Sequence, residues 1–256
     1  MEKQKNFSWE NTPEKYMIDT SKKPLPIFYD FYDLSKDFQN VYEPAEDSFL
    51  LIDSLENDLE QINFDKNKKI TSIELGCGSG LVSCCYLSKL KELNINILNH
   101  YCVDINKDAV NLTQNLLKNY NLDNNVNVLE GDLFNNFDKN IIFDIIIFNP
   151  PYVTTDNEEY ERALKEKDIY AAWAGGKKGS ETINRFVNDL KGHINENSII
   201  FLLLSKENDY ENIIHNLKQL YNFECEILMR KQFKNERLCV FKFYNKNNCK
   251  YIYFKF

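Results

Sequence analysis

Residues 70–80 read ITSIELGCGSG, a short apolar run that leads through one acid into a glycine-rich turn. Glycine at positions 76, 78 and 80 permits a tight turn and lets a ligand lie directly against the backbone. We expect a helix to begin where this turn ends. Because a plain strand–helix connection also often contains glycine, the pattern acquires meaning only from the rest of the chain.

Strand-like and helix-like segments alternate on the C-terminal side of this turn. Short, continuously apolar strands separated by helices indicate a parallel sheet covered on both faces, and two final apolar segments joined by a polar turn indicate an antiparallel pair. We therefore expect an α/β fold, a three-layer sandwich around a seven-stranded, mostly parallel sheet with an antiparallel terminal strand. The expected strands are 70–75, 97–104, 126–132, 143–149, 198–205, 223–233 and 238–245. One expected helix begins near residue 44, and the others cover about 80–93, 107–120, 181–191 and 206–221.

Polar residues stand at the ends of three further expected strands. Asp104 ends the second strand, Asp132 the third and Asn149 the fourth. The carboxyl ends of parallel strands form the ligand-binding edge of an open α/β sheet, so these residues should surround one site. Asp104 follows the glycine turn by about 24 residues, where an acid that binds both ribose hydroxyls is expected.

Glu74 discriminates between nucleotide-like cofactors. A nicotinamide dinucleotide needs GxGxxG so that its pyrophosphate can rest on a helix N-terminus, whereas this loop reads GCGSGL and an acid precedes it. A carboxylate there suits a cation, such as the ammonium of a methionine moiety. We therefore expect S-adenosylmethionine, with Glu74 and the backbone of Gly76 and Gly78 at its methionine end, Asp104 at its ribose, and Asp132 with Leu133 at its adenine.

Residues 143–156 read FDIIIFNPPYVTTD, so the fourth strand ends in an amide, two prolines and an aromatic ring. The nitrogen of a planar amide or aromatic amine is a poor nucleophile because its lone pair is delocalised. Two acceptors that hold both N–H bonds would let the lone pair build up toward a methyl group without prior deprotonation. We predict that Asn149 supplies a side-chain carbonyl, Pro150 a main-chain carbonyl and Tyr152 a flat face, with catalysis by positioning and fixed dipoles.

These motifs together resemble those of the HemK-like amino-methyltransferases, which methylate a glutamine side chain in peptide release factors. The resemblance rests on ELGCGSG (74–80), VDIN (103–106), EGDLF (130–134) and FNPPYV (148–153). Three more stretches, VYEPAEDSFLL (41–51), AAWAGGKKGSE (171–181) and SKEN (205–208), resemble the eukaryotic and archaeal branch. The fold implied is the Rossmann-like class I methyltransferase fold. We expect a methyltransferase domain over 40–245, with an N-terminal extension 1–39 and a C-terminal tail 246–256 outside the similarity.

The resemblance also implies an acceptor, further site residues and a partner. The acceptor would be the glutamine of the Gly-Gly-Gln tip of the eukaryotic class I release factor. Ser48 would lie near the methionine end of the cofactor, Asn149 would contact cofactor as well as substrate, and Pro151 and Val153 would complete the substrate-binding loop. A small zinc-binding methyltransferase activator subunit would complete a heterodimer.

The third expected strand gives an independent reason for a partner. It lies at a sheet edge and carries few charges, and such edges invite pairing with another chain. The alternative is that the N-terminal arm of the same chain covers this edge. Residues 1 to about 40 are polar with interleaved aromatics, so they could form either a tail or a docked arm. The charged segment 157–170 is expected to be a loop.

Composition narrows the remaining alternatives. The net charge of −8 disfavours a nucleic-acid partner. An adenine exocyclic-amine methyltransferase nevertheless stays open, because adenine and glutamine both present a planar NH2 group; a histone lysine methyltransferase and a non-catalytic scaffold are further alternatives. Seven cysteines without a CxxC pair indicate reduced thiols, and the three scattered histidines predict no metal site in this chain. Without a targeting pattern or an apolar run near roughly 18 residues, the expected location is the cytoplasm, with the nucleus left open.

Overall fold

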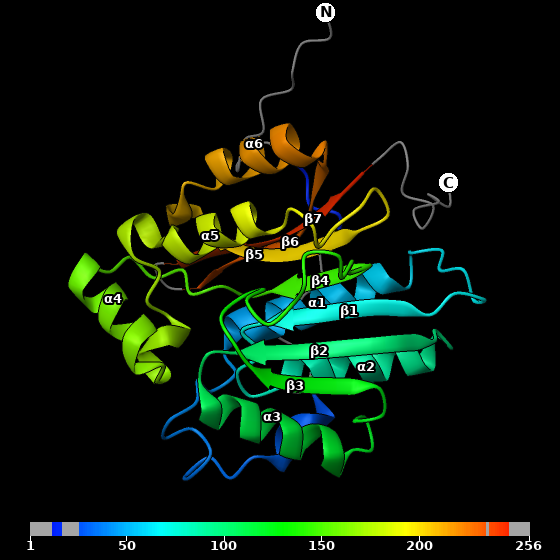
Figure 1. Ribbon diagram of the computed structural model, residues 1–256, viewed down its shortest axis with the longest axis horizontal. Helices are drawn as coiled ribbons and strands as arrows, with labels where there is room; N and C mark the ends of the chain where they lie inside the picture. Colours follow the sequence, from blue (N-terminus) through cyan, green and yellow to red (C-terminus); the bar gives the residue numbers. More distant parts are fainter. Residues whose placement is uncertain (1–11, 17–25, 234–235, 246–256) are drawn as a thin grey trace, which may run out of the picture.

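The computed structural model describes residues 12–16, 26–233 and 236–245 (Figure 1). Seven strands of these residues form one sheet in the order β3-β2-β1-β4-β5-β7-β6. Strands β1 to β5 pair in parallel, and β7 lies antiparallel between β5 and β6. The predicted sheet is therefore confirmed. Its strands are β1 (Ile70–Leu75), β2 (Ile97–Asp104), β3 (Val126–Glu130), β4 (Ile145–Phe148), β5 (Ile199–Ser205), β6 (Glu224–Phe233) and β7 (Glu236–Tyr244).

Helices cover both faces of the sheet (Figure 1). The helices are α1 (Glu46–Leu59), α2 (Leu81–Glu92), α3 (Lys107–Asn119), α4 (Asn157–Glu166), α5 (Glu181–Asp189) and α6 (Tyr210–Tyr221), and short 3-10 turns are η2 (Ile27–Phe31), η3 (Ile169–Ala172), η4 (Lys177–Gly179) and η5 (Lys206–Asn208). In β4, Ile145 and Ile147 join the apolar cluster of α1, α2 and α3, while Ile146 and Phe148 join that of α5 and α6. Because successive side chains of a strand point to opposite faces, a strand between two helical layers must be apolar throughout.

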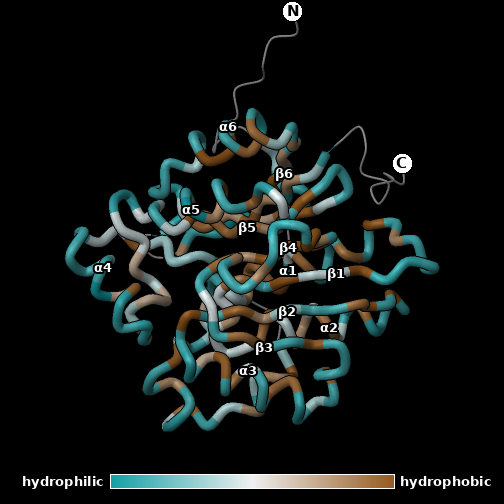
Figure 2. Tube along the Cα trace, viewed as in Figure 1, coloured by the Kyte–Doolittle hydropathy of each residue, from teal (hydrophilic) through white to brown (hydrophobic). Residues whose placement is uncertain are grey.

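Hydrophobic residues concentrate along the central strands, and helix α4 at the periphery is largely hydrophilic (Figure 2). The prediction of a loop over 157–170 was wrong, because α4 occupies most of that segment. Asp156 caps this helix by accepting a hydrogen bond from the Glu159 backbone N–H at 2.8 Å, and acids fill its first turn. Only Ala163 of α4 is buried, so the segment lacks the apolar periodicity by which a helix is recognised in a sequence.

The described parts of the N-terminal arm dock on the domain. Lys15 and Tyr16 donate backbone hydrogen bonds to Ile227 and Leu228 of β6, at 3.0 and 2.9 Å, so residues 12–16 extend the β6 edge. Farther along the arm, Phe28 is buried with its ring centroid 4.7 Å from that of Tyr120 at the end of α3. The arm therefore pairs at the edge opposite β3, and β3 ends the sheet. None of the helices in the described ranges is long and apolar enough to cross a membrane.

Candidate active site

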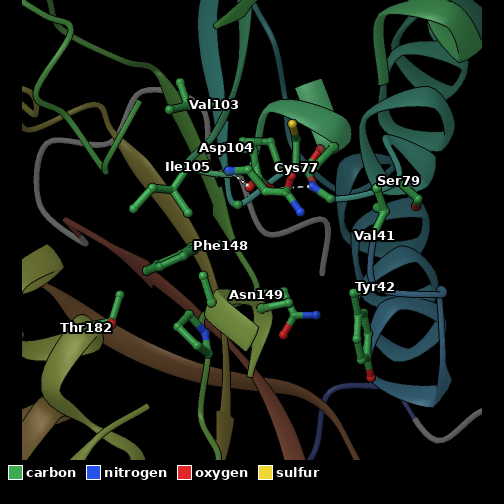
Figure 3. Close-up of a pocket in the computed structure, with 18 of the residues that line it drawn as sticks. Val41, Tyr42, Cys77, Ser79, Val103, Asp104, Ile105, Phe148, Asn149 and Thr182 are labelled. Atoms are coloured by element: carbon green, nitrogen blue, oxygen red, sulfur yellow. Dashed lines mark hydrogen bonds between the residues drawn. The ribbon is translucent and has the colours of Figure 1, made fainter. Parts of the chain in front are cut away.

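A cavity lies at the carboxyl ends of the parallel strands (Figure 3). Its empty space, including the open mouth, is about 1110 Å³, which suits a nucleoside-sized ligand. The structure brings together all the residues predicted to contact a cofactor. These are Ser48, Glu74, Gly76, Gly78, Asp104, Asp132, Leu133 and Asn149, and Pro151 also lies in the wall.

The glycine turn after β1 forms the floor of this cavity. Gly76, Gly78 and Gly80 have φ angles of +64°, +52° and +85°, which side-chain-bearing residues rarely adopt. A β-carbon at Gly80 would also lie 2.9 Å from the Thr113 backbone of α3. Glycine therefore avoids backbone strain at all three positions, and at Gly80 it also allows close packing on α3.

Asp104 joins the glycine turn to the loop after β2. Its Oδ2 accepts a hydrogen bond from the Gly78 backbone N–H, and its Oδ1 accepts one from that of Asn106, both at 2.8 Å. Burial raises the pKa of this carboxyl, although the backbone N–H groups oppose that shift. Each carboxylate oxygen keeps a second lone pair, so Asp104 can still accept hydrogen bonds from a pair of ligand hydroxyls.

Glu74 is buried against a chain of polar groups behind the cavity. The Ser83 hydroxyl donates to Glu74 Oε2, and His100 joins Ser83 through Nε2 at 2.9 Å and Ser72 through Nδ1 at 2.8 Å. Burial raises the pKa of Glu74 to about 8, with a further rise from Asp104 that the Ser83 hydrogen bond opposes. Burial lowers the pKa of His100 to about 3, so its imidazole is neutral. Near pH 7 this carboxyl is therefore mostly protonated, and an approaching cation would favour its ionised form.

Asp132 and Leu133 lie in the cavity wall after β3. Asp132 Oδ2 accepts a hydrogen bond from Arg185 Nη2 of α5 at 2.5 Å, while Leu133 has a left-handed φ of +52°. Sequence reasoning missed Arg185 because nothing local distinguishes it from any arginine on an amphipathic helix. The ion pair fixes the carboxylate and leaves Asp132 Oδ1 available to a ligand.

The N-terminal arm closes part of the same wall. Tyr32 Oη donates to the backbone carbonyl of Ser79 in the glycine turn at 3.1 Å. Asn106 Nδ2 donates to the carbonyl of Asn40 at 2.7 Å, and Val41 and Tyr42 line the cavity. Residues of the predicted extension 1–39 therefore contact the loop that forms the cavity floor.

Asn149 presents an acceptor without a partner. Its Nδ2 donates to Asp47 Oδ2 at 2.9 Å, whereas its Oδ1 is buried and accepts no hydrogen bond. Figure 3 shows the amide between Phe148 and Tyr42 in the cavity wall. Buried polar atoms are nearly always satisfied, so an unpaired carbonyl oxygen on a residue of the cavity wall is a candidate acceptor for a ligand that enters close to it.

The rest of the Asn-Pro-Pro-Tyr loop extends from this wall toward the surface. Pro150, Tyr152 and Val153 lie outside the residues that line the cavity. Tyr152 Oη donates a long hydrogen bond of 3.5 Å to Glu236 Oε2. Burial, followed by the nearby Asp47 carboxylate, raises the pKa of Tyr152 well above its usual value, so this hydroxyl keeps its proton.

Two elements that sequence reasoning assigned no role hold this loop in place. The side-chain Nδ2 of the fully buried Asn208 lies 2.8, 3.0 and 3.3 Å from the carbonyls of Tyr152, Gly179 and Lys178. A β-carbon at Gly179 would lie 1.9 Å from the Tyr152 carbonyl, so only glycine fits there. The sequence signals were the glycines after Trp173 and the capping box that Ser205 forms with Asn208.

The sheet order, its antiparallel end and the position of the cavity define the fold, which is the Rossmann-like class I methyltransferase fold. The solved structure of the E. cuniculi Mtq2–Trm112 complex aligns with a TM-score of 0.57 and 23% identity, over 80% of this chain and 99% of that chain. The T. thermophilus 16S rRNA N2 G1207 methyltransferase aligns with a TM-score of 0.53 and 16% identity, over 80% of this chain and 44% of that one. Both likenesses concern the fold.

Sequence relatives identify the family. The family model of the methyltransferase small domain matches residues 48–167. The eRF1 methyltransferase catalytic subunit mtq2 of Schizosaccharomyces pombe is 32% identical, over 83% of this chain and 93% of the relative. A putative protein N5-glutamine methyltransferase of Methanocaldococcus jannaschii is 35% identical, over 78% of this chain and 89% of the relative. The chain belongs to the HemK-like family of release factor glutamine methyltransferases, so the resemblance drawn from its motifs is confirmed.

Proposed function

We propose that this chain is the catalytic subunit of a protein methyltransferase that acts on a eukaryotic class I peptide release factor. The methyl group passes from S-adenosylmethionine to the side-chain amide nitrogen of the glutamine in the Gly-Gly-Gln tip. The relative from S. pombe is named for eRF1, and the one from M. jannaschii for N5 of glutamine, which supports this acceptor.

The observation that carries the proposal is the orphaned Oδ1 of Asn149. A glutamine amide brings N–H donors, which is the group this buried acceptor lacks. Although Pro150 itself lies outside the residues that line the cavity, the main-chain carbonyl of this next residue would be the second acceptor, on a backbone that proline restricts. Together the two oxygens orient the NH2 group and stabilise the positive charge that develops on its nitrogen.

The residues of the cavity fit the proposed cofactor. The buried Glu74 suits the ammonium of the methionine moiety, Asp104 the ribose hydroxyls, and Asp132 with Leu133 the adenine. Ser48, at the start of α1, lines the same cavity and would lie beside the methionine end. When bound, S-adenosylmethionine would supply a methyl group already activated by a sulfonium, so the chain itself needs to bind, orient and exclude water.

To test this function, the chain is co-expressed with the small activator subunit proposed below. It is then incubated with labelled S-adenosylmethionine and one of two acceptors, the release factor or an adenine-containing oligonucleotide. We expect label on the intact release factor, mapped by mass spectrometry to the Gly-Gly-Gln glutamine, and none on an adenine-containing oligonucleotide. Asn149→Ala should lower kcat by roughly 100-fold or more while cofactor affinity changes little, because this side chain mainly holds the acceptor. Label on the oligonucleotide alone, or undiminished turnover of Asn149→Ala, contradicts the proposal.

We also propose a small zinc-binding activator subunit as the partner, paired with β3. This strand ends the sheet, and two of its five residues, Asn127 and Glu130, are exposed. An unpaired edge offers a row of backbone donors and acceptors to another strand. The solved structure of similar fold that contains Mtq2 is a complex with Trm112, which supports a two-subunit enzyme.

A further inference from the structure

Asn149 can offer an oxygen to a substrate only if its amide faces the right way. The two ends of a carboxamide are nearly the same size, so packing alone does not choose between them. Turned the other way, Asn149 would direct an NH2 group at the NH2 group of the acceptor, and two donors would face each other. Something near Asn149 must therefore select one orientation.

Asp47 is the group that contacts the far end of this amide. Its Oδ2 lies 2.9 Å from Asn149 Nδ2, and its side chain is buried, with 4% of the residue exposed. An ionised carboxylate can accept hydrogen bonds but cannot donate them. A flipped Asn149 would place its oxygen against the Asp47 oxygen, so the contact excludes that orientation.

The surroundings of Asp47 leave its side-chain oxygens available for this contact. Asp47 is the second residue of α1, where the helix dipole favours an anion. Its Oδ1 has only long contacts, 3.5 Å from Tyr42 Oη and 3.4 Å from Ser48 Oγ, and among the described residues no lysine, arginine or histidine forms an ion pair with it. Among the side-chain donors, the amide of Asn149 therefore makes the shortest hydrogen bond to Asp47.

We propose that Asp47 is a positioning residue, which turns the Asn149 carboxamide so that Oδ1 faces the methyl acceptor. The contact joins residues 102 positions apart in the chain. The acceptor in this proposal rests on the proposed function, whereas the orientation of Asn149 does not. The hydrogen bond from Asn149 Nδ2 to the buried Asp47 side chain also polarises the carboxamide and increases the negative charge on Asn149 Oδ1. This oxygen then interacts more strongly with the positive charge that develops on the acceptor nitrogen.

The decisive variant is Asp47→Asn, which preserves size but can donate as well as accept and so tolerates both orientations of Asn149. We expect kcat with saturating release factor to fall about 10- to 100-fold, while the dissociation constant for S-adenosylmethionine changes less than about threefold. In an Asn149→Ala background, Asp47→Asn should cause no further loss, because the two residues act as a unit. Glu46→Gln is the matched control, since it removes a neighbouring charge from the same helix turn without touching Asn149.

A spectroscopic readout separates this inference from the proposed function. In the wild-type chain, one side-chain N–H of Asn149 should resonate downfield in the ¹H–¹⁵N spectrum, assigned through Asn149→Ala, and Asp47→Asn should shift it while Glu46→Gln should not. An unchanged resonance, wild-type kcat in a folded Asp47→Asn protein, or a selective loss of cofactor affinity overturns the role of Asp47. If no release factor is methylated by the wild-type enzyme, the proposed function fails, and the resonance still tests the orientation.

Discussion

Glu74 is a single buried carboxyl that we propose selects the cofactor by charge. It stands in the cavity wall with Asp104, and its hydroxyl partner Ser83 is joined to the neutral imidazole of His100. Hydroxyl groups in this chain can either donate or accept, so the network can adjust to both protonation states of the carboxyl. The sequence indicated an acid next to the glycine turn but not the polar chain behind it.

A pH dependence of cofactor binding follows from this environment. The pKa of Glu74 is raised to about 8 by burial, so the free protein holds a proton there at pH 7, and a bound ammonium favours the ionised form. Binding should therefore release up to one proton, and affinity for S-adenosylmethionine should rise by up to about tenfold per pH unit below pH 8, then level off. Calorimetry in buffers of different ionisation enthalpy measures the released proton.

The matched variant for this prediction is Glu74→Gln, which keeps the hydrogen-bonding shape without a titrating proton. It should bind the cofactor more weakly and with little pH dependence between pH 6 and 8. Cysteine and tyrosine groups packed near Glu74, such as Cys77, Cys102 and Tyr32, have pKa values raised by burial and stay neutral in that range. Wild-type binding without proton release would show that Glu74 does not face the cofactor cation.

Among the elements, the loops around the cavity depend on one buried amide. Asn208 in η5 donates hydrogen bonds to carbonyls of the Asn-Pro-Pro-Tyr loop and of η4. This side chain therefore connects three segments that are separate in the sequence. Buried carbonyls that lose their donor carry a desolvation penalty of about 1–3 kcal/mol. The position of the Asn-Pro-Pro-Tyr loop therefore depends on a residue outside the cavity.

We expect Asn208→Ala to lower the free energy of unfolding by about 1–3 kcal/mol and to reduce kcat even where the protein remains folded. Denaturant titration and steady-state kinetics at low temperature separate the two effects. Asn212→Ala, at an exposed position of α6, is the control and should change neither. A folded Asn208→Ala enzyme with wild-type kcat would show that the loop keeps its position without this amide.

Sequence periodicity predicted strands well at this scale and one helix badly. Every strand of β1 to β7 lies within a few residues of its expected range, and the signal is clearest for the central strands β4 and β5, which are buried along their length between two helical layers. Helix α4 was not predicted because it buries only one residue, an alanine. Its sequence signals are limited to an N-cap residue and the charges in its first and last turns. Such local signals compete with the high polarity that usually marks a loop.

For the molecule as a whole, the two edges of the sheet differ. Residues 12–16 of the arm pair with β6, whereas β3 ends the sheet at the other side (Figure 1). His100 donates its backbone N–H to Asn125 at 2.8 Å, and Gly131 donates to Asp104 at 2.9 Å. Because alternate residues of a parallel strand pair with the same neighbour, the N–H of Val128 points away from β2 and toward the open edge.

Val128→Pro should abolish the proposed heterodimer, because it removes this outward donor and places a ring where a partner strand would lie. Val128→Thr keeps both the N–H and the branched side chain, so it should pair normally. Co-purification of each variant with the proposed small subunit measures the effect, and circular dichroism checks the fold. Wild-type pairing by a folded Val128→Pro chain would place the partner elsewhere.

The linear order of residues was sufficient for the fold class and for the polar residues that the strand ends bring to the cavity. Apolar strands that alternate with helices indicate a parallel sheet with helices on both faces. That topology brings residues such as Glu74, Asp104 and Asn149 together at the carboxyl ends of the strands. The contacts that orient these side chains came only from the folded chain, as with Asp47 on Asn149, Arg185 on Asp132 and Asn208 on Tyr152. Each joins segments more than fifty residues apart, and such pairs depend on how layers pack in three dimensions, for which no local pattern carries a signal.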